Sequence, residues 1–512
     1  MTTAGNQPLA LRNRHQFQRG LLALLLAATS QLLALFSLAA AEPAEKSSLQ
    51  GSRPNIIFII TDDQGYGEMA CHGNPILKTP NLDRLHSESV RFTDFQVSPT
   101  CAPTRTSLMT GRQEFYSGVT HTINERERMS LKRTILPQVL KSAGYTTAIF
   151  GKWHLGDEDA YQPEQRGFDE VFIHGAGGIG QSYPGSCGDA PGNTYFSPAI
   201  LHNGKFEKTD GFCTDVFFRQ ATKWIDSQRQ AKQPFFAYIA TNAPHAPYNA
   251  PENYAAMYKD KGLSPAAVGY YGMITNIDDN IGRLLDQLRD WKIEQETLVI
   301  FMTDNGHAVN DVFNAGIRGM KNTTFEGGTR VPLFFRWPGT LKSGVDVKSL
   351  AAHIDLYPTL AELAGATIPA DMKIDGRSLV PLLKDPAAPW ADRFLFIHQG
   401  RWPKGRAAES KYAHCAVRTA GFRLVNNEML HDIQNDPSES VNVIDKHPDV
   451  VAKMRAAYDQ WWSEILPCLE NEDVVPAAEN PFKTRYVQQF GSLPGKRPGD
   501  QPKKKAKAKA AS

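Results

Sequence analysis

Close pairs of cysteines are missing from this chain. Its 512 residues contain only six cysteines and no CxxC motif, so the sequence gives no support for a structural zinc site. The six are Cys71, Cys101, Cys187, Cys213, Cys415 and Cys468. For an exported protein, Cys187–Cys213 and Cys415–Cys468 are candidate local disulfides, although spacing alone does not fix the connectivity.

The chain also lacks a large excess of either charge, since its formal net charge is only +2. The first 41 residues contribute +3 and the last 17 contribute +6, which leaves −7 for the remainder. A mildly acidic body argues against a nucleic-acid partner. With 41% hydrophobic and 21% charged residues and no internal repeat, the chain is not disordered, collagen-like or a coiled coil. The length predicts about two to four domains, or one large α/β domain with a satellite.

Only one stretch approaches the length and apolarity of a membrane span, at residues 21–41. A basic segment without acids precedes it, and three alanines ending at Ala41 close it before Glu42. This pattern predicts a signal peptide over residues 1–41, cleaved near Ala41, and export to the periplasm or the medium. Contact with the membrane would then be transient. The alternative is an uncleaved membrane anchor.

Short apolar runs alternate with helical patterns along most of the chain. The runs that predict buried strands are residues 55–60, 146–150, 235–240, 297–302 and 331–336. The segments with helical periodicity are residues 81–89, 135–143, 214–228, 278–291 and 356–364. This alternation predicts an α/β fold, with a large, mostly parallel sheet sandwiched by helices. Ligands of such sheets bind beyond the carboxyl ends of the strands, where Asp62, Lys152, Asn242 and Asp304 fall.

Composition changes divide the chain into parts. We expect a catalytic domain at residues 53–385, followed by a Pro- and Ala-rich break. Residues 390–470 predict a small C-terminal α+β subdomain, with short antiparallel strands and an amphipathic helix over 449–466. Residues 471–512 are rich in Pro, Gly and Lys, which predicts a disordered tail.

The decisive motif is Cys101-Ala102-Pro103-Thr104-Arg105, followed by Thr110-Gly111-Arg112. It matches the C-x-P-x-R pattern, with its T-G-R ending, that directs oxidation of the cysteine to formylglycine in sulfatases. The chain therefore resembles the type I, formylglycine-dependent sulfatases of the arylsulfatase A and N-acetylgalactosamine-6-sulfatase kind. The resemblance covers about residues 53–466 and implies an alkaline phosphatase-like fold. It also implies a formylglycine-generating enzyme as a maturation partner.

Two acidic motifs follow predicted strands and suggest a cation. Asp62 and Asp63 are adjacent, and Asp304-Asn305-Gly306 closes a later strand. Adjacent carboxylates repel each other unless a cation lies between them. The resemblance implies that Asp62, Asp63, Asp304 and Asn305, with the modified Cys101, bind Ca²⁺, an ion that prefers oxygen ligands.

Further motifs in the family's order supply cations and histidines. The resemblance places Lys152, in Gly151-Lys152-Trp153-His154, and Lys321, ahead of a GGTRVP run, on the sulfate oxygens. It places His154 on the formylglycine hydroxyls, His245 at the leaving-group oxygen and Arg105 beside the formylglycine and the metal. The glycine run at residues 175–180 fits no nucleotide fingerprint and is interpreted as a flexible rim loop.

These assignments imply an exported sulfatase that hydrolyses sulfate monoesters of carbohydrates or aryl alcohols. A hydroxyl of the hydrated formylglycine would attack sulfur, with His245 as proton donor to the leaving alcohol and His154 as the base that releases sulfate. The partner would be a sulfated small molecule or glycan. Two alternatives stay open: a phosphonate or phosphate monoesterase of the same superfamily, and a non-catalytic protein that binds sulfated glycans.

Overall fold

The computed structural model describes residues 49–494, together with Met1. The predicted signal segment and the Lys-rich end of the chain lie outside the described residues, at 2–48 and 495–512. Within the described part, no helix combines the length and the apolarity needed to span a membrane.

A ten-stranded sheet forms the centre of the fold, in the order β11-β2-β10-β9-β1-β8-β4-β5-β6-β7. Its five central strands are parallel: β9 (Thr297–Thr303), β1 (Asn55–Thr61), β8 (Phe235–Ala240), β4 (Thr146–Lys152) and β5 (Glu170–His174). The flanking strands are β11 (Val345–Val347), β2 (Val90–Phe92), β10 (Leu333–Arg336), β6 (Ala199–His202) and β7 (Lys205–Lys208). The predicted α/β class with a mostly parallel sheet is confirmed.

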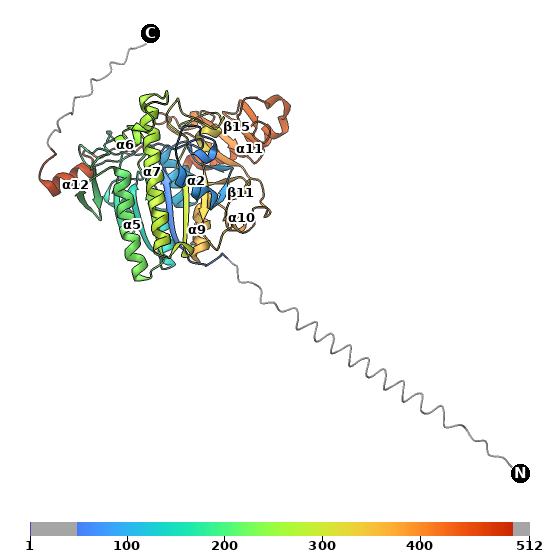
Figure 1. The fold of residues 1–512 in the computed structure, drawn as a ribbon. Helices are drawn as coiled ribbons and strands as arrows, with labels where there is room; N and C mark the ends of the chain where they lie inside the picture. The colour runs from blue at the N-terminus through green and yellow to red at the C-terminus, as the bar shows by residue number, and fades with distance from the viewer. Residues whose placement is uncertain (2–48, 495–512) are drawn as a thin grey trace, which may run out of the picture. The chain divides into compact units, whose positions relative to one another are not determined.

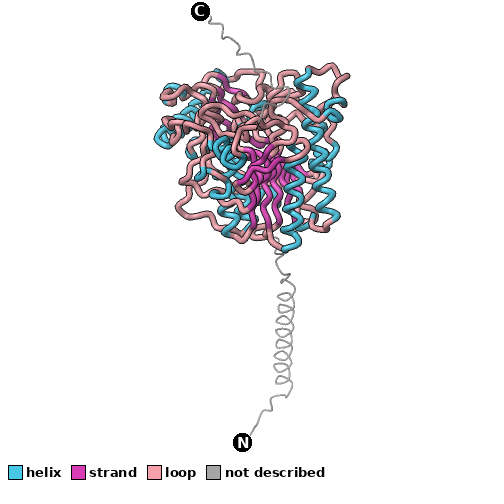
Figure 2. Tube along the Cα trace, turned by 90° about the vertical axis from the view of Figure 1, so that its left-hand side faces the viewer, coloured by secondary structure: helices cyan, strands magenta, loops and turns pink. Residues whose placement is uncertain are grey.

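Both faces of the sheet are buried, as strand β1 illustrates. Ile56, Phe58 and Ile60 enter one hydrophobic core, whereas Ile57 and Ile59 enter the core on the opposite face. The first core is covered by α4 (Leu136–Ser142) and α9 (Leu356–Ala364), and the second by α2 (Pro80–Ser87), α5 (Cys213–Ala231) and α7 (Pro265–Asp290). Figure 1 shows α5 and α7 side by side over the sheet, and Figure 2 shows the strands between helical layers. A strand buried on both faces needs a continuous apolar run, which is why these strands were predictable.

Shorter elements connect the layers. They are α3 (Cys101–Thr110), α6 (Glu252–Ala256), α8 (Glu326–Thr329), α10 (Val380–Lys384) and a two-stranded sheet of β3 (Phe95–Gln96) and β12 (Ala351–Ala352). Helix α3 was not predicted. All ten of its residues are buried, so it has no polar face and shows no helical periodicity.

The C-terminal part contains a separate antiparallel sheet of β13 (Leu395–His398), β14 (Cys415–Arg418), β15 (Phe422–Val425) and β16 (Met429–Asp432). Helix α11 (Pro448–Ile465) packs its aromatic side chains against this sheet, around Tyr458, Trp461 and Trp462. The predicted antiparallel strands and amphipathic helix are therefore present.

The prediction of disorder from residue 471 onward was wrong for the described part of that segment. Helix α12 (Pro481–Phe490) is capped by Asn480, whose side chain accepts hydrogen bonds from the N–H groups of Phe482 and Lys483. Phe482 and Tyr486 are buried against Phe206 of β7. Composition missed this helix because the contacts that stabilise it come from distant residues.

Neither candidate disulfide forms, because all six cysteines are free. Cys187 accepts a hydrogen bond from the N–H of Gly156, whereas Cys213 begins α5 and lies in the core on the α5 face of the sheet. Cys415 is buried in β14, and the thiol of Cys468 donates to the carbonyl of Glu464 one helical turn earlier.

Candidate active site

The ten predicted site residues come from six segments that meet at one edge of the central sheet. They follow the carboxyl ends of four parallel strands, or lie on α3 and on the loop before α8. They are Asp62 and Asp63 after β1, Lys152 and His154 at the end of β4, His245 after β8, Asp304 and Asn305 after β9, Cys101 and Arg105 on α3, and Lys321 before α8. Parallel strands place their carboxyl ends together, so segments far apart in sequence share this site.

Cys101 is the first residue of α3 and is only 3% exposed. The N-terminal end of a helix carries partial positive charge and free N–H groups, which favour an anion. Arg105 lies one turn later, on the same helix face. Its guanidinium donates to the Asp304 carboxylate at 2.8 Å and lies 4.0 Å from Asp62. The helix therefore holds residue 101 and a buried cation beside the carboxylates.

Oxygen atoms suited to a cation are left without partners in this cluster. One carboxylate oxygen of Asp62, Oδ1, and the amide oxygen of Asn305 are buried and accept no hydrogen bond. Ligand atoms of Asp62, Cys101 and Asp304 lie within 4.8 Å of one another. Buried unpartnered oxygens are costly unless a ligand satisfies them. The donor set therefore fits a hard, oxygen-binding cation such as Ca²⁺.

Each acid of the cluster also has a basic partner. Lys152 lies 2.7 Å from Asp62, and Lys321 lies 2.6 Å from Asp63. Burial raises the pKa of Asp63, but Lys321 and His245 outweigh burial and hold it below its ordinary value. Burial and then the neighbouring Asp62 raise the pKa of Asp304 to about 7. The carboxylates thus crowd each other enough to need positive charge.

His154 is oriented as a base toward residue 101. Its Nδ1 lies 3.5 Å from the Cys101 sulfur, and its Nε2 lies 2.9 Å from the carbonyl oxygen of Thr122. A carbonyl only accepts, so Nε2 carries the proton and Nδ1 presents its lone pair. Burial, followed by the charge of Lys152, holds the pKa of His154 well below its ordinary value. The ring is therefore neutral at pH 7.

Both ring nitrogens of His245 also have polar neighbours. Its Nδ1 donates to the carbonyl of Ala246 at 2.7 Å, and its Nε2 lies 3.7 Å from an Asp63 oxygen. Burial and then Lys321 lower its pKa to about 4. An anion bound next to Lys321 would raise that pKa, so His245 could acquire a proton once an anionic substrate is present.

The glycine run at residues 175–180 packs against the site instead of forming a free rim. A Cβ added at Gly177 would lie 2.9 Å from Cε1 of His154. The N–H of Ile179 donates to the side chain of Asn242, at the end of β8. Glycine is therefore required where this segment crosses the His154 ring.

Two residues near residue 101 have no sequence motif. The carbonyl of Thr122 orients His154, and the hydroxyl of Thr122 accepts a hydrogen bond from Arg401. Arg401 and Thr122 are 279 positions apart. Only the folded chain brings them together, so sequence analysis missed both.

Comparison with known proteins identifies the family. The profile of the Sulfatase family matches residues 54–366, which is more than half of the chain. The chain belongs to the sulfatase family. The profile described as N-sulphoglucosamine sulphohydrolase, C-terminal, matches residues 320–461 of this sulfatase. The expected family is thereby confirmed, and the chain is a sulfuric ester hydrolase.

Individual relatives of this sulfatase agree with that assignment. Dog (Canis lupus familiaris) N-acetylgalactosamine-6-sulfatase is 33% identical over 380 residues, covering 68% of this chain and 69% of the relative. Human arylsulfatase A is 31% identical over 439 residues, covering 76% and 83%. The structure of Ps i-CgsB in complex with k-i-k-neocarrahexaose is 28% identical, covers 86% and 99%, and has a TM-score of 0.74. A phosphonate monoester hydrolase of Agrobacterium radiobacter shares the fold, at 20% identity and a TM-score of 0.58.

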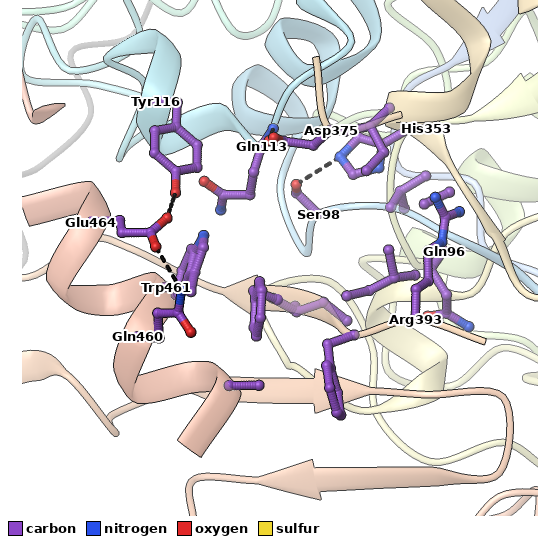
Figure 3. A pocket seen from close by; sticks show the side chains of 18 residues that line it. Gln96, Ser98, Gln113, Tyr116, His353, Asp375, Arg393, Gln460, Trp461 and Glu464 are labelled. Carbon is purple, nitrogen blue, oxygen red and sulfur yellow. Dashed lines mark hydrogen bonds between the residues drawn. The ribbon is translucent and has the colours of Figure 1, made fainter. Parts of the chain in front are cut away.

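A cavity of about 500 Å³ lies between the catalytic part of the sulfatase and its C-terminal sheet. Figure 3 shows its polar lining, where Ser98 faces His353 and the Tyr116 hydroxyl donates to Glu464. None of the ten predicted site residues lines this cavity. The cavity is therefore distinct from the cluster around Cys101.

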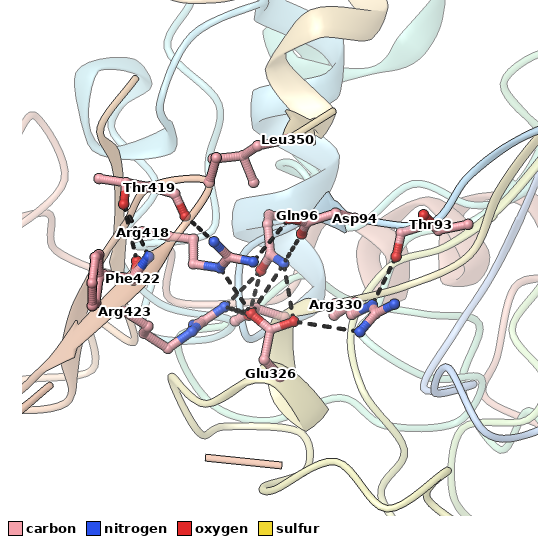
Figure 4. Close-up of polar contacts among 12 residues, drawn as sticks. Thr93, Asp94, Gln96, Glu326, Arg330, Leu350, Arg418, Thr419, Phe422 and Arg423 are labelled. Atoms are coloured by element: carbon pink, nitrogen blue, oxygen red, sulfur yellow. Dashed lines mark hydrogen bonds and ion pairs between the residues drawn. The ribbon is translucent and has the colours of Figure 1, made fainter. Parts of the chain in front are cut away.

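A buried charge network joins the C-terminal sheet to the segment that carries Lys321. Glu326, five positions after Lys321, accepts hydrogen bonds from Arg418 of β14 at 3.0 Å and from Arg423 of β15 at 2.5 Å (Figure 4). Burial raises the pKa of Glu326, but Arg423 and Arg418 outweigh burial and lower it to about 2. The C-terminal sheet is thus ion-paired to the start of α8, five positions after Lys321.

Proposed function

We propose that this sulfatase hydrolyses sulfate monoesters of carbohydrates, using a formylglycine made from Cys101 and a bound Ca²⁺, in an exported protein. The observation that carries the proposal is the position of residue 101. It begins a buried helix, and its sulfur lies 3.5 Å from the lone-pair nitrogen of His154. The oxidation motif around Cys101 supports the modification, and the unpartnered oxygens of Asp62 and Asn305 support the ion.

The lysines provide the first requirement, which is to hold an anionic ester. Lys152 and Lys321 each lie within 2.7 Å of a carboxylate of the metal cluster. The ammonium groups can therefore bind sulfate oxygens while they remain held by Asp62 and Asp63. Fixed positive charge of this kind stabilises the charge that develops in a transition state.

The histidines provide the proton transfers. Nδ1 of His154 can take a proton from residue 101, because Nε2 keeps its proton on the Thr122 carbonyl. His245 lies beside Lys321 and Asp63, where a protonated Nε2 can give its proton to the departing alcohol oxygen. His154 thus accepts a proton from residue 101, whereas His245 donates one to the leaving alcohol.

The residues described above would hold two groups. Asp62, Asp63, Asp304 and Asn305 would hold Ca²⁺, and residue 101 would carry the formylglycine. When bound, the ion supplies positive charge to the sulfate, and the hydrated aldehyde supplies a hydroxyl nucleophile that can later release sulfate. Arg105, in contact with Asp304, would keep the carboxylates and residue 101 aligned.

The support for carbohydrate esters comes from relatives. Several are named for amino-sugar sulfates, and Ps i-CgsB was crystallised with a neocarrahexaose. A signal peptide ending near Ala41 would bring the enzyme to extracellular glycans. Sequencing the mature N-terminus tests export: a start at Glu42 supports it, and a retained Met1 contradicts cleavage.

The first experiment is mass spectrometry of protein from its native source, on the tryptic peptide of residues 92–105. An aldehyde at position 101 supports the proposal, and a thiol in the folded protein would favour the glycan-binding alternative. Hydrolysis of matched sulfate and phosphate esters then separates a sulfatase from the phosphonate or phosphate monoesterase alternative. Faster phosphate ester hydrolysis would reject the sulfatase activity.

A further inference from the structure

A loop of the C-terminal part, just after β13, contacts two segments that border the active site. The side chain of Gln399 donates to the carbonyl of Asn322, the residue after Lys321, at 2.9 Å. Two residues later, Nη2 of Arg401 donates to the hydroxyl of Thr122 at 2.7 Å. The carbonyl of Thr122 holds His154 against residue 101. Arg401 is therefore connected to residue 101 through two intermediate residues, Thr122 and His154.

Arg401 differs from the other cations of the site because it has no acidic partner among residues 49–494. Lys152, Lys321 and Arg105 each have a carboxylate within 2.8 Å, from Asp62, Asp63 and Asp304 respectively. The Nε of Arg401 is buried without a hydrogen-bond partner. Burial is the largest influence on the pKa of Arg401 and lowers it. A guanidinium in this state favours an anionic ligand.

His121 offers a neutral donor next to that guanidinium. Its Nδ1 accepts hydrogen bonds from the N–H groups of Thr122 and Ile123, at 2.8 Å and 3.1 Å. The proton of the neutral ring must therefore be on Nε2. Burial, followed by the charge of Arg401, lowers the pKa of His121 to about 3, so the ring is neutral at pH 7. The side chain is partly exposed, which leaves its N–H available to a ligand.

We propose that Arg401 and His121 form a subsite for a second anionic group, a carboxylate or a second sulfate, on the saccharide whose sulfate ester is cleaved. This inference rests on the proposed function and narrows its substrate class. The scissile sulfate carries one negative charge and already has Lys152 and Lys321, so Arg401 is left for another group. The planar guanidinium binds carboxylate and sulfate oxygens in pairs, and His121 would donate to the same group or to a neighbouring hydroxyl.

The test compares substrates with one and with two anionic groups. The probes are 4-methylumbelliferyl sulfate and sulfated disaccharides from chondroitin and heparin. Each cleaved disaccharide is paired with the same compound after removal of its second sulfate or reduction of its carboxylate. The variants are Arg401→Gln, the conservative Arg401→Lys, and Lys404→Gln as the control on an exposed residue of the same loop.

We expect Arg401→Gln to lower kcat/KM for the dianionic saccharide by about 10- to 100-fold, mainly through KM, as for the loss of a charged hydrogen bond. The fold-loss in kcat/KM should be at least about tenfold smaller for the aryl sulfate and for each disaccharide that lacks the second anionic group. Arg401→Lys should fall between the wild type and Arg401→Gln, and Lys404→Gln should match the wild type. If removal of the second sulfate abolishes the effect of Arg401→Gln, the second group is a sulfate. If reduction of the carboxylate abolishes it, the second group is a carboxylate.

An equal loss on all substrates would overturn the proposal, since Arg401 would then act on the scissile sulfate. A preferred substrate with a single anionic group would also overturn it. Calorimetric binding of the same saccharides to Cys101→Ala, with and without Arg401→Gln, tests the subsite without turnover. A matured enzyme that cleaves no sulfate ester would contradict the proposed function, whereas loss of saccharide binding on Arg401→Gln would still support the subsite. Thermal melting shows whether each variant is folded.

Discussion

The Nδ1 atom of His154 faces the sulfur of Cys101 at 3.5 Å, while the opposite ring nitrogen donates to the Thr122 carbonyl. His154 adopts a φ of +58°, a left-handed conformation that few side chains tolerate well. This backbone conformation sets the direction of the ring, and the Thr122 carbonyl sets its tautomer. Strain of this kind is typical of functional positions.

His154→Asn tests the proton-accepting role. Asparagine tolerates positive φ, but its amide cannot take up a proton. We expect kcat for an aryl sulfate to fall by about 10²- to 10⁴-fold, the usual contribution of a general base. His414→Asn is a matched control, because His414 also has a positive φ, +54°, but is exposed. Wild-type kcat in His154→Asn would show that the base is elsewhere.

Gly177→Ala tests how precisely the ring must be placed. The added methyl group would lie 2.9 Å from Cε1 of His154, so the ring would have to shift. Because small displacements of reacting groups are costly, we expect kcat to fall by about 10- to 100-fold with little change in melting temperature. Gly421→Ala is the control, since nothing lies within 4 Å of its added Cβ. If Gly177→Ala and Gly421→Ala had the same kcat, the contact would be unimportant.

The sequence predicted those elements whose signals are local. β1, β4, β8 and β9 were predictable because burial on both faces requires apolar runs, and the ends of these strands located Asp62, Lys152 and Asp304. Helix α7 begins at Pro265, whereas only its second half, from residue 278, showed helical periodicity. Its first half is buried through Tyr270, Tyr271 and Met273, which removes the polar face that marks an amphipathic helix.

Contacts between distant residues were not predictable. Helix α12 depends on burial of Phe482 against Phe206, and Arg401 reaches the active site through Thr122. The charge balance between Lys321 and Asp63 spans 258 positions. Motifs thus identified which residues gather at the site, whereas their protonation states and supporting contacts required the folded chain.

Asp62→Asn tests the metal site through stability. Ca²⁺ that binds only the folded protein stabilises it by about 2.7 kcal/mol at a concentration 100 times its Kd. We therefore expect a chelator to lower the melting temperature of the wild type, and added Ca²⁺ to restore it. Asp62→Asn should respond weakly, because the variant loses a carboxylate with an unpartnered buried oxygen. The exposed Asp371→Asn should respond like the wild type. A wild-type melting temperature insensitive to Ca²⁺ would contradict the site.

Glu326→Gln tests the network that joins the C-terminal sheet to the Lys321 segment. The substitution leaves Arg418 and Arg423 buried without their shared carboxylate. Breaking a buried ion pair by removing one partner typically costs about 3–5 kcal/mol, so we expect a loss of this order in the free energy of unfolding at pH 7. Urea denaturation measures it, and Glu428→Gln, on an exposed turn of the same sheet, serves as the control.

The same variant has a defined pH dependence. Because the folded protein lowers the pKa of Glu326 from its ordinary value of 4.5 to about 2, ionised Glu326 stabilises the fold fully above pH 4.5. That contribution is lost as the pH falls toward 2. The difference in unfolding free energy between wild type and Glu326→Gln should therefore be constant from pH 7 to 5 and shrink at lower pH. A difference that stays constant down to pH 3 would mean that packing, and not the charge of Glu326, holds the C-terminal sheet against the active site.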